Sequence, residues 1–538
     1  MKRFLPSLLN NFINPQVNLL RPLCLLPVLV SLICLFQSAP ISAAQQAKGE
    51  TVYRSYFYGG LTGYQQSLFQ GFIVSEFPRG KTVNQIMTNE TSLRSMTRLA
   101  EALLYRNEGE DLENAVKILR WIVKNQYTDV KSEYYGLWKT NVLNDRHDQN
   151  WREFVGCDLI IIYHFYQQLL PADLLESIKS GLIHAANGAL KRNVGADYTN
   201  ISVMSAFLMD YVGKTFDINE LKTGGLQKAK EIYQLFNRHQ TFSEYNSPTY
   251  YGVTLIGLAL WRELASEPVK KMGLELEEAL WTEIGRNYHP RLRNLTGPYF
   301  RAYGMDMRKY YSIAGIWIAV ALDAEKLAPL PRGKGAKEEE MSNIAPILHL
   351  GLSIPKSVLV SMKDFTDSAF TERLVPSKIA GDTLKRITTM VSPGWTMGGL
   401  WGNLRVWNQI KTGTIHWQNS NAETEWLLVP GDGKTNVRIT RTSMNIFRTD
   451  EKSTSFSLYI YARDLRKFNV SDKIWKFPAM ELTVNTKLRK SWNRITDPKI
   501  LYESCAISEE YPAVLKITFQ IPATWRKEDP LVEIIPNK

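Results

Sequence analysis

A short stretch of the chain, residues 238–252, gathers many groups that can transfer protons. It holds the imidazole of His239, the carboxylate of Glu244 and the phenols of Tyr250 and Tyr251. Imidazole, carboxylate and phenol are side chains that enzymes use as general acids and bases. The stretch therefore predicts a site of acid–base chemistry.

The stretch leads into a helix that must be covered on every side. Ser247 is expected to cap this helix and Pro248 to occupy its first turn, where proline loses no hydrogen bond. Residues 253–261 are apolar around their whole circumference. The acid–base groups are therefore expected at the edge of a buried region, where this helix begins.

Two kinds of helical segment alternate between residues 86 and 325. Amphipathic segments with one charged face are predicted at 111–120, 172–191, 226–237 and 274–288. Segments that are apolar on nearly every side are predicted at 154–170, 201–209, 253–261 and 313–322. Buried inner helices shielded by amphipathic outer ones predict an α/α toroid, an incomplete helical barrel. An α-solenoid is the alternative, but its repeats should resemble one another, and these segments do not.

Each predicted inner helix begins with a polar or aromatic cluster. The clusters lie at residues 150–153, 198–200, 246–247 and 303–308. If the inner helices run parallel, all four clusters meet at one end of the ring. That end is the candidate active-site cleft.

The pattern changes after residues 329–340, a Pro-, Gly- and charge-rich stretch that reads as a linker. Beyond it, short segments alternate apolar and polar residues and are rich in β-branched and aromatic side chains, which predicts an antiparallel β-sandwich. The predicted organisation is a secretory leader at 1–44, a toroid at 45–327, a linker at 328–342 and a sandwich at 343–538.

The leader is predicted from its three parts. Lys2 and Arg3 precede an apolar segment at 25–36, and small residues follow at 42–44. An uncleaved signal anchor is the alternative, although the apolar segment is short for a membrane span. We therefore expect a secreted or periplasmic protein with no stable membrane anchor after cleavage.

The cysteines and the net charge of the chain limit the cofactors and partners that the sequence predicts. Cys24 and Cys34 leave with the leader, and the sequence does not decide whether Cys157 and Cys505 pair. No cofactor and no metal is expected, with a structural calcium on loop carboxylates as the open alternative. The formal charge of +12 without Lys/Arg-rich runs favours an anionic extracellular partner over nucleic acid. The sequence does not indicate the oligomeric state.

An exported chain with a helical ring followed by an all-β domain resembles the α/α-toroid polysaccharide lyases, which include the alginate, chondroitin AC and heparinase II/III-like lyases. The resemblance implies an anionic or neutral polysaccharide as partner, and the 14 tryptophans and 25 tyrosines suit the faces of sugar rings. It also implies β-elimination beside a uronic acid. That reaction needs a neutralised carboxylate, removal of the C5 proton and protonation of the leaving oxygen.

The resemblance also implies roles for particular residues. Tyr250 is expected to be the base or the acid, with Tyr251 as runner-up and Tyr303 as a competing acid. Asn200 with Arg308 is expected to bind the uronate carboxylate, although Ile201 stands where the alginate lyases have histidine. Further candidates for catalysis or substrate binding are His239, Glu244, Asn246, Trp151, Arg152, His147, Asp306 and Arg301.

Two other functions compete with elimination. Glycoside hydrolysis needs two carboxylates across one bond, for which Glu244 or Asp306 could pair with Asp148, and Glu153 is a further carboxylate. A non-catalytic glycan-binding protein would keep the fold without a converging acid–base set. Facing carboxylates would favour hydrolysis, whereas convergence of Asn, Tyr and Arg would favour elimination.

Overall fold

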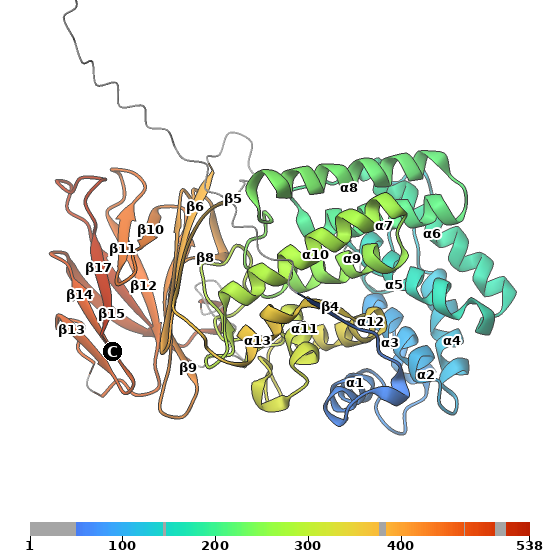
Figure 1. Cartoon of the computed structure of the whole chain (residues 1–538), viewed down its shortest axis with the longest axis horizontal. Coiled ribbons are helices and arrows are strands. Elements are labelled where there is room, and N and C mark those ends of the chain that lie inside the picture. Colours follow the sequence, from blue (N-terminus) through green and yellow to red (C-terminus); the bar gives the residue numbers. More distant parts are fainter. Residues whose placement is uncertain (1–49, 144–146, 376–383, 467, 501–512, 538) are drawn as a thin grey trace, which may run out of the picture. The chain divides into compact units, whose positions relative to one another are not determined.

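A computed structural model describes residues 50–143, 147–375, 384–466, 468–500 and 513–537 (Figure 1). The predicted leader and Cys505 lie outside these residues, so export and the pairing of Cys157 stay predictions. Within the described ranges, no helix combines the length and the apolar character that a membrane crossing requires.

The helical part is built from antiparallel hairpins of neighbouring helices. The pairs are α3 (Leu93–Arg106) with α4 (Asp111–Val123), α5 (Trp151–Tyr166) with α6 (Ala172–Arg192), α7 (Thr199–Thr215) with α8 (Asn219–His239), and α9 (Tyr250–Leu264) with α10 (Glu267–Asn287). The first helix of each pair contacts the first helix of the next pair, and α9 also contacts α11 (Ile313–Leu322). Helix α12 (Ile344–Leu350) contacts both α3 and α9.

The burial of these helices follows the predicted alternation. Helices α7, α9 and α11 are buried along nearly their whole length, and α5 is buried over most of its length, whereas α6, α8 and α10 bury one stripe each. Helix α3 also belongs to the buried set. The predicted α/α toroid is confirmed, with inner helices that lie against one another and outer helices that shield them.

Smaller elements complete the helical part. They are α1 (Gly63–Glu76), α2 (Val83–Ile86), α13 (Lys356–Lys363), the pair β1 (Thr51–Arg54) and β4 (Leu352–Pro355), and the pair β2 (Tyr288–His289) and β3 (Asn294–Leu295). Short 3-10 helices lie at Tyr58–Gly60, Gln167–Leu169, Glu325–Leu327 and Glu338–Asn343.

The helical part extends beyond the boundary predicted at residue 343. Helices α12 and α13 follow that residue, and their apolar side chains join the helical core. The predicted linker packs against the same part: Ala336 donates its N–H to the carbonyl of Lys309 and accepts from the N–H of Tyr311. A high Pro and Gly content indicates a lack of regular structure, but it does not show that a loop is free of the core.

The second part of the described chain is an antiparallel β-sandwich, as predicted. Its larger sheet has the order β15-β16-β12-β9-β8-β7-β6-β5, and its smaller sheet has the order β10-β11-β17-β14-β13. The strands of the larger sheet are β5 (Ala369–Val375), β6 (Lys385–Ser392), β7 (Trp395–Trp401), β8 (Val406–Gln418), β9 (Thr424–Asp432), β12 (Ser455–Tyr461), β15 (Arg489–Ile495) and β16 (Val514–Gln520). Those of the smaller sheet are β10 (Thr435–Ile439), β11 (Met444–Arg448), β13 (Ile474–Phe477), β14 (Met480–Asn485) and β17 (Val532–Asn537).

The central strands of the larger sheet are buried on both faces. Met397, Ile415 and Trp417 point into a core shared with the smaller sheet. Trp426 and Leu428, on β9, belong instead to the core of the helical part. The larger sheet therefore carries side chains that reach the helices as well as side chains that fill the sandwich.

Close packing of α9 against α11 gives a test of the ring. A Cβ at Gly252 would collide with the backbone of Ile313 and Ala314, so we expect Gly252→Ala to force the two helices apart. The free energy of unfolding should fall by about 1–3 kcal/mol in urea titrations.

The matched control is Gly71→Ala on α1, where the added methyl meets no other atom. Alanine favours a helix over glycine, so this variant should gain up to about 1 kcal/mol. Equal stability of the two variants would contradict the close approach of α9 and α11.

Candidate functional site

The four helix-start clusters meet at one end of the ring, as the sequence predicted. Hydrogen bonds join them in turn: Asn150 Nδ2 donates to the Tyr198 hydroxyl at 3.1 Å, and Asn200 Nδ2 donates to Glu244 Oε1 at 2.8 Å. The hydroxyls of Tyr250 and Tyr303 are 2.9 Å apart. The starts of α5, α7 and α9 and the loop before α11 thus form one site.

Glu244 is the central group of this site. Its side chain is only 6% exposed, and it accepts the backbone N–H of Asn200 at 2.9 Å as well as the Asn200 amide. Arg301 Nη1 donates to the same carboxylate at 2.6 Å. Bonds of this kind, with a charged partner, are among the stronger ones in proteins, so Glu244 fixes both neighbours.

The loop that carries Glu244 is held at both ends. Thr241 donates to Glu283 Oε1 at 2.9 Å, and Asn246, in a left-handed conformation, donates to the Pro298 carbonyl at 3.2 Å. Ser247 Oγ accepts the N–H of Tyr250 at 3.0 Å. Helix α9 begins at Tyr250 with Thr249 at the N-cap position, so the start predicted at Pro248 is wrong by two residues, and Ser247 and Pro248 belong to the turn before the helix. These hydrogen bonds therefore fix the conformation of the loop between α8 and α9.

The segment around Arg301 joins the loop to the large sheet. Ser247 Oγ donates to the Arg301 carbonyl at 2.6 Å, and the N–H of Phe300 donates to the Tyr245 carbonyl at 3.1 Å. On its other side, the N–H of Ala302 donates to the carbonyl of Gln409 in β8 at 2.9 Å. Strand β8 is thereby placed beside the helix starts.

Arg301 lies among aromatic rings. Its guanidinium carbon is 3.5 Å from the centre of the Tyr250 ring, 5.4 Å from that of Trp407 and 5.6 Å from that of Tyr198. Burial disfavours its charge, but Glu244 together with the phenols of Tyr250 and Tyr198 outweighs burial and holds the pKa of Arg301 above its ordinary value. Arg301 is therefore a permanent cation.

Tyr250 holds its proton tightly. Burial raises the pKa of its phenol well above the ordinary value, and the Arg301 cation only partly opposes this. Its neighbour Tyr303 has Lys337 Nζ at 5.1 Å from the ring centre. Tyr250 is therefore protonated at neutral pH and is not available there as a base.

A cavity of about 280 Å³ opens beside this cluster. Its walls come from both parts of the chain: Asp197, Tyr198, Ser243, Glu244, Phe300, Arg301, Lys385, Arg405, Trp407 and Ile410. Arg405 lies 4.2 Å from the centre of the Trp407 ring, and Lys385 Nζ lies 5.6 Å from that of Phe300. Three basic side chains and several aromatic rings thus surround the cavity.

Sequence reasoning missed the residues that the sheet contributes, which are Lys385, Arg405 and Trp407. Arg405 and Trp407 do stand at alternate positions, a spacing that places side chains on one face of a strand. That spacing does not say which surface the face meets. Asp197 was also missed, although it directly precedes the Tyr198 cluster.

The predicted pairing of Asn200 with Arg308 is not formed. Arg308 Nη2 donates to Thr424 Oγ1 of β9 at 3.0 Å, and its Nε lies 3.6 Å from Asp306. Asp306 is fully buried and accepts the N–H of Arg308 at 2.9 Å, and burial raises its pKa. These two residues anchor β9, and Arg301 is the arginine beside Asn200 and Glu244.

Three more predicted site residues serve the structure instead. Tyr251 is fully buried and its hydroxyl donates to Glu283. The Asn246 amide is used on backbone carbonyls, and Arg152 donates twice to the carbonyl of Tyr135, at 3.1 and 2.8 Å. Neighbouring residues in one helix turn face different sides, and the sequence could not show which side faces the cavity.

The remaining candidates lie around the cluster, outside the cavity wall. His147 Nε2 is hydrogen-bonded to the Tyr127 hydroxyl at 2.7 Å, and its ring stacks on Tyr134 at 3.8 Å. Asp148 accepts the N–H of Asn150 at 2.9 Å, and Trp151 has Arg94 at 5.8 Å from its ring.

His239 closes α8, and burial together with Arg238 lowers its pKa, so it is neutral near pH 7. In the described ranges, no three His, Cys, Asp or Glu side chains gather in a way that could hold a metal ion.

The fold defines the class of this protein as an α/α toroid followed by an antiparallel β-sandwich. Residues 81–351, half of the chain, match the family described as domain of unknown function DUF8769. The chain belongs to this family. No curated protein matches the chain.

The chain is similar to several solved structures. Heparinase III is 7% identical, with 88% of this chain and 85% of that chain covered and a TM-score of 0.44. The chondroitin AC lyase of Streptomyces coelicolor A3, in complex with chondroitin sulphate, is 10% identical, with 90% and 81% covered and a TM-score of 0.45. A glycoside hydrolase is 11% identical, with 90% and 77% covered and a TM-score of 0.31. At such identities and scores, the chemistry has to be argued from the residues of this chain.

Glu153, on the first turn of α5, makes stability depend on pH. It is fully buried 3.2 Å from Arg192 Nη1, and burial raises its pKa to about 7 against the opposing pull of that arginine. Near pH 6 the folded protein holds a proton that the unfolded chain releases, so stability falls as the pH rises through about 7. We expect Glu153→Gln, which is neutral throughout, to remove about 2–3 kcal/mol of this decline.

Urea unfolding at about pH 5 and about pH 8 measures that decline. Glu113→Gln is the control, because Glu113 is exposed on α4 and its pKa is lowered by Lys117, so it stays charged over this range. Glu277, also buried with a pKa raised to about 7, should keep some pH dependence in every variant. An unchanged slope in Glu153→Gln would contradict the buried, protonated state.

Proposed function

We propose that this protein degrades a polysaccharide, and that it cleaves a uronic-acid-containing chain by β-elimination. One observation carries the proposal: a permanent cation, Arg301, lies in the cavity wall with the rings of Tyr198 and Tyr250 beside it and Tyr303 bonded to Tyr250. Asn200 and Glu244 complete this convergence of Asn, Tyr and Arg. Export, which the predicted leader implies, would bring the enzyme to such a substrate.

Carboxylate neutralisation is the first requirement of the reaction, because the C5 proton becomes acidic only when the adjacent negative charge is offset. Arg301, whose charge Glu244 already offsets, lies on one wall. Lys385 of β6 and Arg405, which directly precedes β8, bring two further cations. An anion in a cavity with low water content gains more from such charges than it would in bulk water. These three residues are the proposed binders of the uronate group.

Proton transfer is the second requirement. Tyr250, with its raised pKa, is the proposed donor to the leaving oxygen, and Tyr303 is placed to resupply its proton through the bond between their hydroxyls. Tyr198 is the phenol on the cavity wall itself, and the guanidinium carbon of Arg301 lies 5.6 Å from the centre of its ring. Tyr198 is the proposed base.

Asn200 takes a different role from the one that the resemblance implies. Its amide donates to Glu244 and its side chain is fully buried, so it does not face the cavity. We assign it a positioning role: it holds Glu244, which holds Arg301.

Hydrolysis has one specific observation in its favour. Asp197 and Glu244 both line the cavity, and paired carboxylates are what glycoside hydrolysis needs. The carboxylates expected to pair with Glu244 are elsewhere, since Asp148 bonds to Asn150 and Asp306 lies beside Arg308. Glu244 also accepts bonds from both Asn200 and Arg301, which suits a structural ion pair better than a nucleophile.

Incubation of the protein with a panel of uronic-acid polysaccharides separates the two reactions. Elimination produces an unsaturated product that absorbs in the ultraviolet, and reducing ends without that absorbance would mean hydrolysis. A panel of neutral polysaccharides should give neither signal if the uronate is required.

Three single variants test the phenols. We expect Tyr198→Phe and Tyr250→Phe each to lower kcat on the active polysaccharide by about a hundredfold or more, because each removes a proton-transfer group. Tyr303→Phe should have a smaller effect, since it acts through Tyr250. Initial rates of absorbance increase measure all three.

Tyr233→Phe is the matched control, because that tyrosine lies on the outer helix α8 and bonds to Glu275 of α10. It should retain the full rate. Full activity of Tyr250→Phe and Tyr198→Phe together with loss of activity in Asp197→Asn would replace elimination with hydrolysis.

A further inference from the structure

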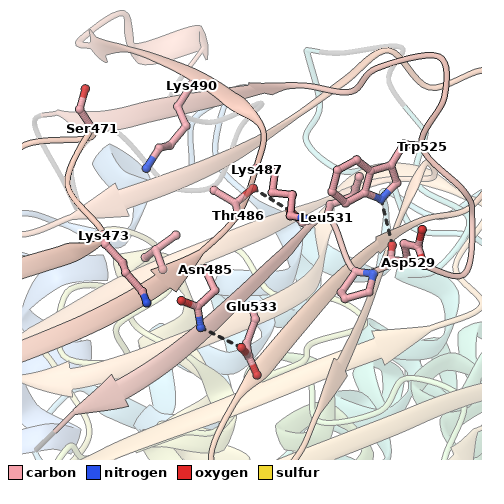
Figure 2. Close-up of a pocket in the computed structure, with 12 residues that line it drawn as sticks. Ser471, Lys473, Asn485, Thr486, Lys487, Lys490, Trp525, Asp529, Leu531 and Glu533 are labelled. Carbon is pink, nitrogen blue, oxygen red and sulfur yellow. Dashed lines mark hydrogen bonds between the residues drawn. The ribbon is translucent and has the colours of Figure 1, made fainter.

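A second cavity lies in the β-sandwich, far along the chain from the residues of the first. Its volume is about 800 Å³, and it is lined by strands β14 and β17 of the smaller sheet, by Lys490 of β15 in the larger sheet and by the loops beside these strands. Lys473 and Lys490 stand across it from Trp525 and Asp529, with Lys487 between them (Figure 2). We call it the β14–β17 cavity.

The β14–β17 cavity holds three lysines, and the Asp472 carboxylate partly offsets the charge of Lys490. Lys473 and Lys487 are exposed, and neither forms an ion pair with any residue that the structure describes. The Lys490 ammonium lies 5.8 Å from the centre of the Trp475 ring, and its contact with Asp472 is to a carbonyl oxygen at 3.5 Å. The cavity therefore presents three ammonium groups to a ligand.

The carboxylates in the cavity already have partners. Glu533 accepts the Asn485 amide at 2.9 Å, and Asp529 lies 3.5 Å from Arg526. Arg526 offsets the charge of Asp529, whereas the Asn485 amide is neutral and leaves the charge of Glu533 in place. The three lysines of the lining still outnumber these two carboxylates, so the lining carries a net positive charge.

Trp525 gives the cavity an ordered aromatic wall. Its indole N–H donates to the carbonyl of Asp529 at 3.2 Å, and the ring packs partly against the sandwich core. A fixed, half-buried indole offers a flat apolar face at little cost in side-chain entropy. The C–H groups of a sugar ring pack well on such a face.

Part of the cavity wall lies on the face of the smaller sheet that points away from the sandwich core. Val484 and Val532 are buried in the sandwich core, and the alternation along a strand turns Asn485 and Glu533 to the opposite face. The larger sheet, not this one, contributes side chains to the helical core. A polymer could therefore occupy this face while another segment occupies the first cavity.

We propose that the β14–β17 cavity binds an acidic saccharide, with Lys473, Lys487 and Lys490 on its carboxylate or sulphate groups and Trp525 against a ring. Amide and ammonium donors beside an aromatic face match both parts of such a ligand. Binding here would hold a long anionic polysaccharide on the enzyme and raise its local concentration at the catalytic cavity. The site does not depend on the cleavage chemistry.

Affinity electrophoresis of the full-length protein tests the site. Gels contain polygalacturonate, alginate, chondroitin sulphate or heparin, with dextran as the neutral polymer, and the Tyr250→Phe background limits cleavage of the probe. Retardation by at least one acidic polymer and none by dextran is expected. The double variant Lys473→Gln/Lys487→Gln should bind about fivefold more weakly, since each exposed ion pair contributes modestly.

The matched control is Lys230→Gln/Lys271→Gln, which removes the same charge from exposed positions on α8 and α10. It should bind like the parent protein. Trp525→Leu keeps an apolar side chain without the flat ring and should also weaken retardation, with thermal unfolding as the check that it is folded.

Each possible result has a different meaning for this proposal. Equal weakening by both lysine pairs would mean diffuse attraction to a basic surface. No retardation by any acidic polymer would remove the site, and competition by a DNA oligonucleotide at equal strength would indicate a nucleic-acid site. Lysine-dependent retardation without any cleavage activity in the parent protein would keep this proposal and reject the catalytic one.

Discussion

The buried ion pair between Glu244 and Arg301 is the contact on which the site depends. Glu244 also accepts two N–H groups of Asn200, so one carboxylate links the start of α7, the loop before α9 and the segment that runs along β8. Removal of either charge would leave the other buried without compensation, a loss of about 3–5 kcal/mol in comparable pairs. The geometry of the Tyr250 and Tyr303 pair follows, because Arg301 packs on the Tyr250 ring.

The same contact explains why two unlike parts of the chain make one cavity. Parallel inner helices bring their starts together, but they leave one side of that end open. Strand β8 covers it because the segment that carries Arg301 bonds to β8 through Ala302 and Tyr299. Trp407 of β8 and Arg405, which directly precedes that strand, then line the cavity together with residues of the helix starts. A site built from the helical ring alone would lack the part of the cavity wall that comes from Lys385, Arg405 and Trp407.

The sequence was sufficient for the fold and for the meeting of the helix starts, because both depend on local patterns. Apolar residues around the whole helix distinguish α9 from α10 in the sequence. Because the inner helices run in one direction, the polar clusters at their starts come to the same end of the ring. Which arginine reaches the carboxylate was not predictable: Arg301 and Arg308 stand in one loop, and only tertiary contacts send Arg308 to β9. Lys385 was missed for a similar reason, since its place depends on how a distant sheet packs.

The cavity beside Arg301 is the proposed site of β-elimination at a uronic acid. Proton nuclear magnetic resonance of the products from the most readily cleaved polysaccharide tests it directly. Elimination predicts a vinyl proton signal at C4 of each new non-reducing end, which grows in proportion to the new reducing ends. Saturated non-reducing ends with an equal number of new reducing ends would contradict the claim and establish hydrolysis.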